Sequence, residues 1–346
     1  MPPLLEVQGL EIAFYTKNGV VRAVNDISYT LDQGDTLGIV GESGSGKSVS
    51  ALAMLRLLPE PPARILGGKV LLEGRDVLAL PRHELHTIRG GKIAMVFQDP
   101  MTSLNPVMTI GDQIGEAVRI NLQLSARAAR ARTLEVLAQV GIPNPRDRSG
   151  DYPHQFSGGQ RQRVMIAMAI SCGPKLLIAD EPTTALDVTI QAQIVDLIKR
   201  LQADLRMAVI WITHDLGVVA RIARRVNVMY AGSIVESGPI SDIFAHPGHP
   251  YTIGLIASVP KAGMKRDEQL RFIEGSPPDL SRLPEGCAFA PRCEFRTAES
   301  LAARPALREV GPGHFVACCN VEAVRLHQRA EVTRSSRAAT VGKELA

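Results

Sequence analysis

Apolar and polar positions nearly alternate over residues 4–15 and 20–31, close to the start of the chain. Alternation with a period of two predicts strands that bury one face and expose the other. Other apolar runs are short and end in turn residues, which predicts further strands, the most apolar of them buried. These runs cover residues 35–40, 67–74, 92–98, 175–182 and 207–215, and the pattern at 226–238 predicts a hairpin.

Between these strands, apolar side chains recur with the spacing of helices. We expect helices over 48–58, 109–120, 125–141 and 188–205. In the last of these, one face carries Ile190, Ile194, Leu197, Ile198, Leu201 and Leu205. Strands that alternate with helices predict an α/β fold with a largely parallel sheet. The helical stretch at about 101–172 interrupts this alternation and is expected to be an inserted subdomain.

Composition is that of a globular protein. The 346 residues suffice for one large domain or two, and 45% are hydrophobic and 21% charged. The net charge of +4 is too small to indicate a nucleic-acid partner. The longest apolar runs reach about a third of a membrane span, and MPPLLEVQGL lacks the features of a secretory signal. We therefore expect a cytoplasmic protein.

Composition changes after about residue 245, where proline, arginine and cysteine accumulate. We expect an appendage there, and a disordered polar tail over 323–346. In a reducing compartment, clustered cysteines indicate metal binding more often than disulfides. Four of the five cysteines lie in this region: Cys287, Cys293, Cys318 and Cys319.

The segment GESGSGKS matches the G-x-x-x-x-G-K-[ST] pattern of a phosphate-binding loop, between a predicted strand and a predicted helix. Glycines let backbone N–H groups converge on phosphate oxygens, and the helix start adds positive potential. Lys47 is expected to reach the β- and γ-phosphates, and Ser48 to bind Mg²⁺. The alternative is a glycine-rich turn that binds nothing. The loop comprises Gly41, Glu42, Ser43, Gly44, Ser45, Gly46, Lys47 and Ser48.

Two acidic residues end the buried strand in LLIADEP. Ligands of open α/β sheets bind at the carboxyl ends of the strands, where Asp180 and Glu181 are expected to lie. Asp180 suits Mg²⁺, and Glu181 suits a general base toward an attacking water. Adjacent acids at a strand end are also common in solvated turns, but the phosphate-binding loop upstream favours the catalytic interpretation.

Well downstream of that loop, FSGGQRQR precedes the helical run VMIAMAI. This stretch resembles the LSGGQ signature of ATP-binding cassette (ABC) proteins, with Phe156 in place of leucine. In that family two nucleotide-binding domains pack head to tail, and each signature faces the γ-phosphate held by the other. The resemblance implies that Ser157, Gly158, Gly159 and Gln160 contact ATP bound to a partner. The alternative is an ordinary serine cap followed by a flexible turn.

The resemblance assigns roles to further positions. Gln98 is similar to the Q-loop glutamine, which contacts Mg²⁺ and water and reports to the transmembrane partner. Asp187 ends a segment like the D-loop, and His214 in WITHD resembles the switch histidine, which contacts the γ-phosphate and holds the attacking water. An aromatic side chain stacks on adenine in this family, and Phe14 is the expected one, with Tyr15 as the alternative.

Longer stretches narrow the resemblance. FQDPMTSLNPVMTIGDQI, DEPTTALDVTIQAQI and HPYTIGLIASVP are similar to the ATP-binding subunits of bacterial dipeptide/oligopeptide (and nickel) importers. The similarity covers residues 4 to about 320 and implies an ABC-type P-loop domain over 4–245, followed by a C-terminal extension over 246–322. Such importers combine two ATPase subunits, identical or homologous, with two membrane permeases and a periplasmic peptide-binding protein. The resemblance therefore places the chain at the cytoplasmic face of the bacterial inner membrane, as a peripheral subunit.

The function implied is ATP hydrolysis that drives import of short peptides, through closure and reopening of an ATPase dimer. Two alternatives are a soluble ABC ATPase of DNA repair or translation, and an ATP sensor that does not hydrolyse. The first class carries a long coiled-coil insertion or two cassettes in one chain, and this sequence has neither. Intact Glu181 and His214 disfavour the sensor. An exporter is disfavoured because exporter cassettes are commonly fused to membrane spans.

In some members of this family, four cysteines of the extension hold a [4Fe–4S] cluster, and GCAFAPRC resembles part of that motif. Cys287 and Cys293 match its first two positions, Ser300 stands at the third, and Cys318 matches the fourth. Cys319 is additional and offers a substitute thiolate. We expect iron–sulfur binding here ahead of zinc, with a degenerate site of small buried thiols as the alternative.

Overall fold

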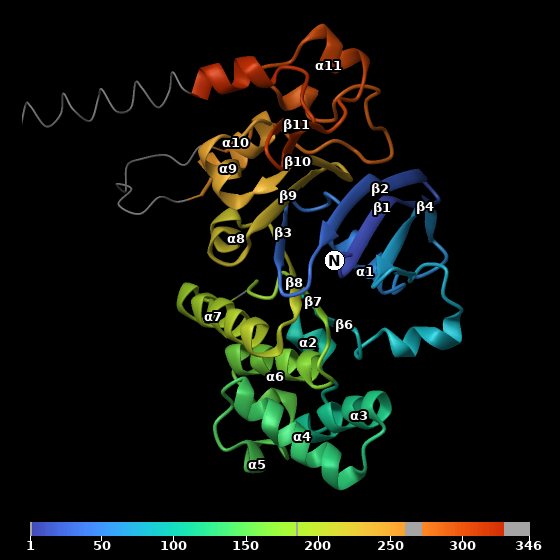
Figure 1. The fold of residues 1–346 in the computed structure, drawn as a ribbon, viewed down its shortest axis with the longest axis vertical. Helices are drawn as coiled ribbons and strands as arrows, with labels where there is room; N and C mark the ends of the chain where they lie inside the picture. Colours follow the sequence, from blue (N-terminus) through green and yellow to red (C-terminus); the bar gives the residue numbers. More distant parts are fainter. Residues whose placement is uncertain (1, 185, 260–271, 329–346) are drawn as a thin grey trace, which may run out of the picture.

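The structure, a computed structural model, describes residues 2–184, 186–259 and 272–328 (Figure 1). The central sheet holds the parallel strands β6 (Ile93–Val96), β7 (Leu176–Asp180), β8 (Ala208–Thr213), β3 (Thr36–Val40) and β9 (Arg225–Tyr230). Every residue of β3, β7 and β8 is buried, as expected for strands covered on both faces. The predicted α/β class is confirmed, and β9 forms the predicted hairpin with β10 (Ser233–Pro239).

A second, antiparallel sheet is formed by the N-terminal part of the chain. Its order is β2 (Gly19–Leu31), β1 (Leu5–Thr16), β4 (Ala63–Leu72) and β5 (Arg75–Asp76). Buried side chains of β1 share one apolar cluster with β3 and with α1 (Lys47–Met54). Helix α1 ends before the predicted residue 58, because Arg56 adopts a left-handed φ of 50°.

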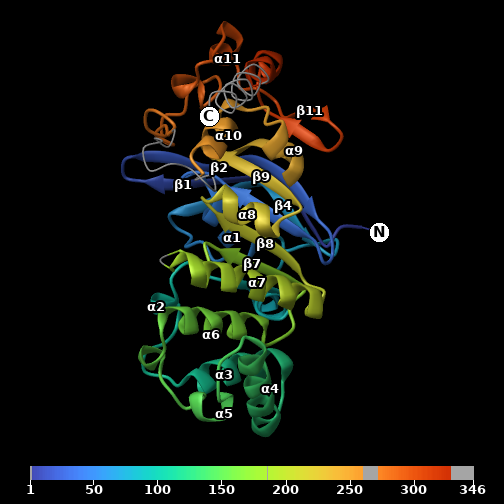
Figure 2. The same cartoon turned by 90° about the vertical axis from the view of Figure 1, so that its left-hand side faces the viewer.

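The predicted insertion forms a helical layer. It contains α2 (Pro100–Ser103), α3 (Ile110–Leu122), α4 (Ala126–Gln139), α5 (Pro145–Arg148) and α6 (Gly158–Ile170). Figures 1 and 2 show these helices at the end of the molecule opposite the C-terminal elements. Four of the helices begin at side-chain caps, because Asp99, Thr109, Ser125 and Ser157 each accept a hydrogen bond from a backbone N–H of the first turn.

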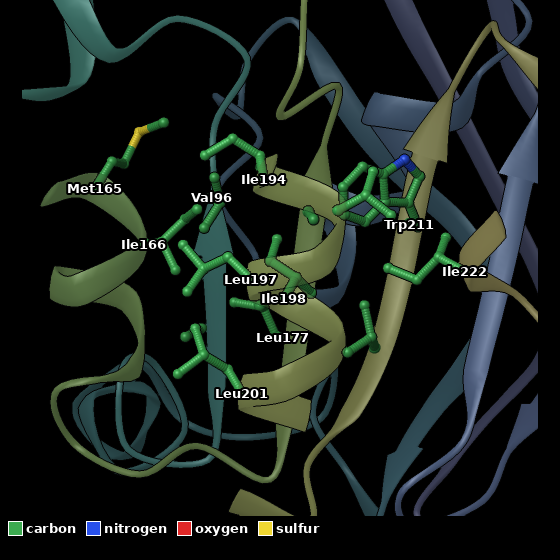
Figure 3. Close-up of a cluster of buried hydrophobic side chains, with 14 of the residues drawn as sticks. Val96, Met165, Ile166, Leu177, Ile194, Leu197, Ile198, Leu201, Trp211 and Ile222 are labelled. Carbon is green, nitrogen blue, oxygen red and sulfur yellow. The ribbon is translucent and has the colours of Figure 1, made fainter. Parts of the chain in front are cut away.

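Helix α7 (Val188–Leu205) joins the helical layer to the sheet. Figure 3 shows it packed beside α6 and the strands through four buried side chains, Ile194, Leu197, Ile198 and Leu201. Trp211 of β8 is fully buried in the same cluster. The predicted apolar face is confirmed, although its end members Ile190 and Leu205 are only partly buried. Neither α7, with 18 residues the longest described helix, nor any other helix in the described ranges is apolar enough to cross a bilayer.

The C-terminal region, which composition predicts to be an appendage, adds strands to the edge of the central sheet. Helices α8 (Leu216–Ile222), α9 (Ile240–Ala245) and α10 (Pro250–Ala257) are followed by α11 (Ala298–Ala302), β11 (Arg308–Gly311) and β12 (His314–Val316). Strand β12 pairs with β10, so the sheet order is β11-β12-β10-β9-β3-β8-β7-β6.

The prediction of a disordered tail from residue 323 is wrong for its first residues. Residues 321–328 are helical, and Val324 is fully buried. Val324 follows Val321 at a helical spacing of three, a short signal that the composition-based prediction overlooked. The rest of the predicted tail, 329–346, lies outside the described residues.

Candidate functional site

The phosphate-binding loop connects β3 to α1, as predicted. Gly44 and Gly46 have φ angles of 78° and 97°, in the left-handed region that favours glycine. A Cβ atom at Gly46 would lie 2.3 Å from the carbonyl oxygen of Ala23, so a larger residue does not fit there. The tight curl of the loop before the helix start therefore depends on glycine.

Lys47 begins α1 and turns back across the loop. Its Nζ donates hydrogen bonds to the carbonyl oxygens of Gly41 and Glu42, at 2.7 and 2.9 Å. Burial lowers the pKa of Lys47, and the negative charges of Glu181, Asp180 and Glu42 oppose this effect. The ammonium group is thus held over the loop, where phosphate oxygens would replace its carbonyl partners.

Ser48 and Asp180 form the oxygen-rich part of the site. Asp180 ends β7, and its Oδ1 accepts a hydrogen bond of 2.9 Å from Ser48 Oγ. Burial raises the pKa of Asp180, and the hydrogen bond from Ser48 offsets part of this rise. A hydroxyl and a carboxylate oxygen are hard ligands of the kind that Mg²⁺ prefers. The structure thus brings two of the predicted magnesium ligands together, and their donor atoms fit the ion.

Glu181 is held by side chains from three different segments. Its Oε2 accepts hydrogen bonds from Gln98 Nε2, at 3.0 Å, and from Thr184 Oγ1, at 2.9 Å. Its Oε1 lies 3.3 Å from Nδ1 of His214. The backbone N–H of Glu181 donates to the carbonyl oxygen of Ile212, and its φ of 46° turns the side chain out of the strand direction. The carboxylate therefore has a fixed orientation.

These residues meet because the sheet is parallel. Gln98 follows β6, Asp180 ends β7 and His214 follows β8, so their side chains gather at one edge. A carboxylate beside an imidazole can accept a proton from water while the imidazole holds the water or the carboxylate. Thr184 was not predicted, although its place directly after DEPT in the sequence was an available signal.

The signature segment starts α6, away from its own phosphate-binding loop. Ser157 Oγ accepts a hydrogen bond of 3.3 Å from the N–H of Gln160, while the Ser157 N–H donates to Gln160 Oε1 at 3.0 Å. A Cβ at Gly159 would lie 2.9 Å from a methyl carbon of Ile190 on α7. Across the described residues, no hydrogen bond joins 157–160 to 41–48. The hydrogen bonds of Ser157 and Gln160 are therefore those of a helix cap.

Asp187 and the two N-terminal aromatics have local partners. Asp187 caps α7, because its Oδ1 accepts a hydrogen bond of 2.9 Å from the N–H of Ile190. Phe14 and Tyr15 are neighbours on β1 and face opposite sides of the sheet. Phe14 packs against the buried cluster around α1, whereas Tyr15 is 45% exposed and lies under the guanidinium of Arg64. Tyr15, the alternative to Phe14, presents the more open ring.

The four C-terminal cysteines come together around one small cavity. Its volume is about 20 Å³, and Ser300 and His249 also line it. The backbone N–H of Cys287 donates to the carbonyl oxygen of Ser300 at 2.7 Å, so residue 300 does lie beside the thiols. The sequence thus identified which residues would gather here: Cys287, Cys293, Cys318 and Cys319.

These residues do not fit a four-thiolate cluster. The hydroxyl of Ser300 donates a hydrogen bond to the carbonyl oxygen of Thr297 at 2.8 Å and accepts one from the Thr297 N–H at 2.9 Å. Both hydrogen bonds cap the start of α11, so the hydroxyl is already occupied. Burial raises the pKa of all four thiols, that of Cys318 to about 11. Within the described residues, no three His, Cys, Asp or Glu side chains form a group that could hold a metal ion. The expected iron–sulfur or zinc site is therefore not supported.

Family models and relatives agree with this architecture. A model described as ABC transporter matches residues 24–184, and one for the C-terminal region of oligopeptide/dipeptide transporters matches residues 235–299. The oligopeptide transport ATP-binding protein OppD of Bacillus subtilis is 51% identical over 90% of this chain and 87% of its own length. The dipeptide transport ATP-binding protein DppD of the same organism is 50% identical over 92% of this chain and 95% of its own length.

Solved structures show the same cassette. A dimeric structure of MJ0796, a bacterial ABC transporter cassette, has a TM-score of 0.61 and 26% identity, covering 68% of this chain and 98% of that one. Another structure of MJ0796 is a dimeric post-hydrolysis state bound to ADP and Pi, with the same TM-score of 0.61. The chain therefore belongs to the ABC transporter ATP-binding family, in the branch of the oligopeptide and dipeptide transport ATP-binding subunits.

Proposed function

We propose that this chain is the ATP-hydrolysing subunit that powers import of short peptides through an ABC transporter. One observation carries the proposal: a carboxylate, Glu181, is fixed by Gln98, Thr184 and His214 beside the phosphate-binding loop. An ATP sensor would not need a fixed base at this position. The relatives OppD and DppD are named as peptide transport proteins, which supports peptides as the solute and disfavours DNA repair or translation.

ATP is bound by the loop between β3 and α1. The N–H groups of residues 41–48 and the ammonium of Lys47 bind the β- and γ-phosphate oxygens. Ser48, Asp180 and Gln98 would hold Mg²⁺, and the ion would offset the charge of the β- and γ-phosphates. An aromatic side chain of β1 stacks on adenine, and the exposure of Tyr15 favours it over Phe14.

Hydrolysis needs a positioned water. Glu181 accepts the proton of that water. Nδ1 of His214 lies 3.3 Å from Oε1 of Glu181, so His214 positions the carboxylate relative to the γ-phosphate. Most of the catalytic effect comes from positioning and charge, because phosphoryl transfer needs little covalent help from the protein.

The site is completed by a second ATPase subunit. Ser157, Gly158, Gly159 and Gln160 of one chain face the γ-phosphate on the other, and the start of α6 favours that negative charge. Asp187 lies in the segment that crosses the same interface. ATP binding closes the dimer, and hydrolysis reopens it. The nucleotide-binding domain that undergoes this cycle spans 4–245, with its helical subdomain at about 101–172.

Two permeases and a periplasmic peptide-binding protein complete the transporter. The segment after Gln98 exposes apolar side chains suited to a permease helix, among them Met101, which is 59% exposed, and Val107, which is 79% exposed. The chain is thus a peripheral subunit on the cytoplasmic face of the membrane, and its extension over 246–322 lies against the nucleotide-binding domain.

A phosphate-release assay on the complete transporter tests this function. Glu181→Gln removes the base but keeps the shape, so turnover should fall by about 10²–10⁴-fold while ATP binding persists. ATP should then trap a closed dimer, visible by size-exclusion chromatography. Asp196→Asn is the matched control. Asp196 lies on α7 and forms a surface ion pair with Arg221 at 3.8 Å, so its loss should leave turnover unchanged. A normal rate in Glu181→Gln would show that the base is assigned to the wrong residue.

A further inference from the structure

The C-terminal extension contacts the phosphate-binding loop at Glu42. Arg292, in the short helix Ala290–Arg292, donates hydrogen bonds from Nη1 and Nη2 to the two carboxylate oxygens of Glu42, at 2.7 and 3.0 Å. The hydroxyl of Tyr251, on α10, accepts a further hydrogen bond of 2.7 Å from the backbone N–H of Glu42. Both the side chain and the backbone of this loop residue are therefore held by the extension.

Arg292 is itself rigidly placed. Its side chain is only 5% exposed, and its Nε donates to the carbonyl oxygen of Glu274 at 2.8 Å. Its guanidinium lies 5.9 and 5.8 Å from the ring centroids of Tyr230 and Phe289. A buried guanidinium that forms a two-point contact fixes the orientation of its carboxylate as well as pairing its charge. Glu42 is thus oriented by a side chain that has little freedom of its own.

Glu42 also touches the group that binds phosphate. Its carbonyl oxygen accepts the 2.9 Å hydrogen bond from Lys47 Nζ. A rotation of the Glu42 peptide would therefore change both the lysine contact and the direction of the neighbouring loop N–H groups. Gly41, Gly44 and Gly46 leave the loop flexible without such restraint.

We propose that Arg292 is a positioning residue for nucleotide binding: acting through Glu42, it holds the phosphate-binding loop in its ATP-binding conformation. Ordering a glycine-rich loop costs conformational entropy, and a loop ordered in advance binds its ligand more tightly. The extension therefore sets the affinity of the chain for ATP. This inference rests on the proposed function, because it concerns the same nucleotide site.

The test is Arg292→Met, which keeps an apolar stem near the two rings and removes the guanidinium fork. We expect the KM and Kd for MgATP to rise about tenfold, with kcat changed less than about twofold, because no reacting atom is touched. Glu42→Gln should weaken binding similarly, and the double variant should be no worse than either single one. Unchanged ATP affinity in Arg292→Met would overturn the proposal.

Arg304→Met is the matched control. Arg304 also fastens the extension, through the carbonyl oxygen of Asn25 and the hydroxyl of Ser233, but it does not contact the loop. Its loss should leave ATP affinity within about twofold. An equal weakening in Arg304→Met would mean that general loosening of the extension is the cause, and the positioning role would be excluded.

Gentler variants cover the case in which Arg292→Met does not fold. Tyr251→Phe removes only the acceptor of the Glu42 N–H, and Arg292→Lys keeps the charge without the two-point geometry. Each should raise the Kd about threefold at an unchanged melting temperature. Normal affinity in both would refute the inference. A wild-type chain that fails to bind ATP would instead contradict the proposed function.

Discussion

The nucleotide site is assembled at the ends of neighbouring parallel strands, whereas the C-terminal extension is attached through buried side chains that meet across the edge of the sheet. In the first region, Ser48 meets Asp180 because β3, which leads into the loop, and β7, which ends at Asp180, lie on either side of β8. In the second, Glu236 of β10 is 0% exposed and accepts hydrogen bonds from His314 of β12 and from the N–H groups of Gly248 and His249.

The two regions should therefore respond differently to mutation, one in catalysis and the other in stability. In the nucleotide site, Gln98, Glu181 and His214 are at least partly exposed and work on a ligand, so losing one of them affects chemistry more than folding. The groups around Glu236 are enclosed by protein, so losing one leaves buried polar atoms without partners. Arg292 shares features of both regions. It is buried, like the groups around Glu236, and it contacts Glu42 of the phosphate-binding loop.

The largest predicted effect breaks the attachment of the extension. Glu236→Ala would leave the buried donors of His314, Gly248 and His249 unpaired and should lower the free energy of unfolding by about 3–5 kcal/mol. Urea denaturation followed by circular dichroism measures this change.

An exposed glutamate in the same extension gives the comparison. Glu309 accepts a hydrogen bond from the Gly313 N–H at 2.9 Å on the surface, so Glu309→Ala should cost less than about 0.5 kcal/mol. If Glu236→Ala were as stable as Glu309→Ala, the extension would be a loosely attached appendage after all.

A smaller effect sharpens the interpretation of the cysteines. We predict that anaerobically purified protein contains little iron, sulfide or zinc, because Ser300 replaces one thiolate and its hydroxyl caps α11. Ser300→Cys adds a thiol to the cavity at the third position of the motif, beside Cys287, and should raise iron and sulfide content, with new absorbance near 400 nm.

Ser281→Cys, on an exposed turn of the extension, is the control and should bind no more iron than the wild type. Four irons per wild-type chain would contradict the prediction and would show that Cys319 supplies the missing thiolate.

Sequence patterns identified residues that the fold gathers at the candidate nucleotide site, because some are consecutive and the others end parallel strands. Gly46, Lys47 and Ser48 are consecutive at a strand–helix junction, and the fold brings the ends of β6, β7 and β8 to the same edge. The same logic does not choose between Phe14 and Tyr15, since alternation along a strand does not say which face the ligand occupies.

The extension could not be predicted in this way. Strands β11 and β12 have only 4 and 3 residues, too few for a periodic pattern. Arg292 and Glu42 are 250 positions apart, and no motif links them. Only packing places Arg292 beside two aromatic rings and so directs it at the phosphate-binding loop.

The central claim is that ATP hydrolysis by this chain drives peptide import. The most direct measurement is uptake of a labelled oligopeptide into proteoliposomes that contain the chain, its partner ATPase, both permeases and the peptide-binding protein. With wild-type chain, uptake should require MgATP; with Glu181→Gln, it should fall to the level without ATP although nucleotide still binds. Uptake at the wild-type rate with Glu181→Gln, or wild-type uptake without ATP, would contradict the account.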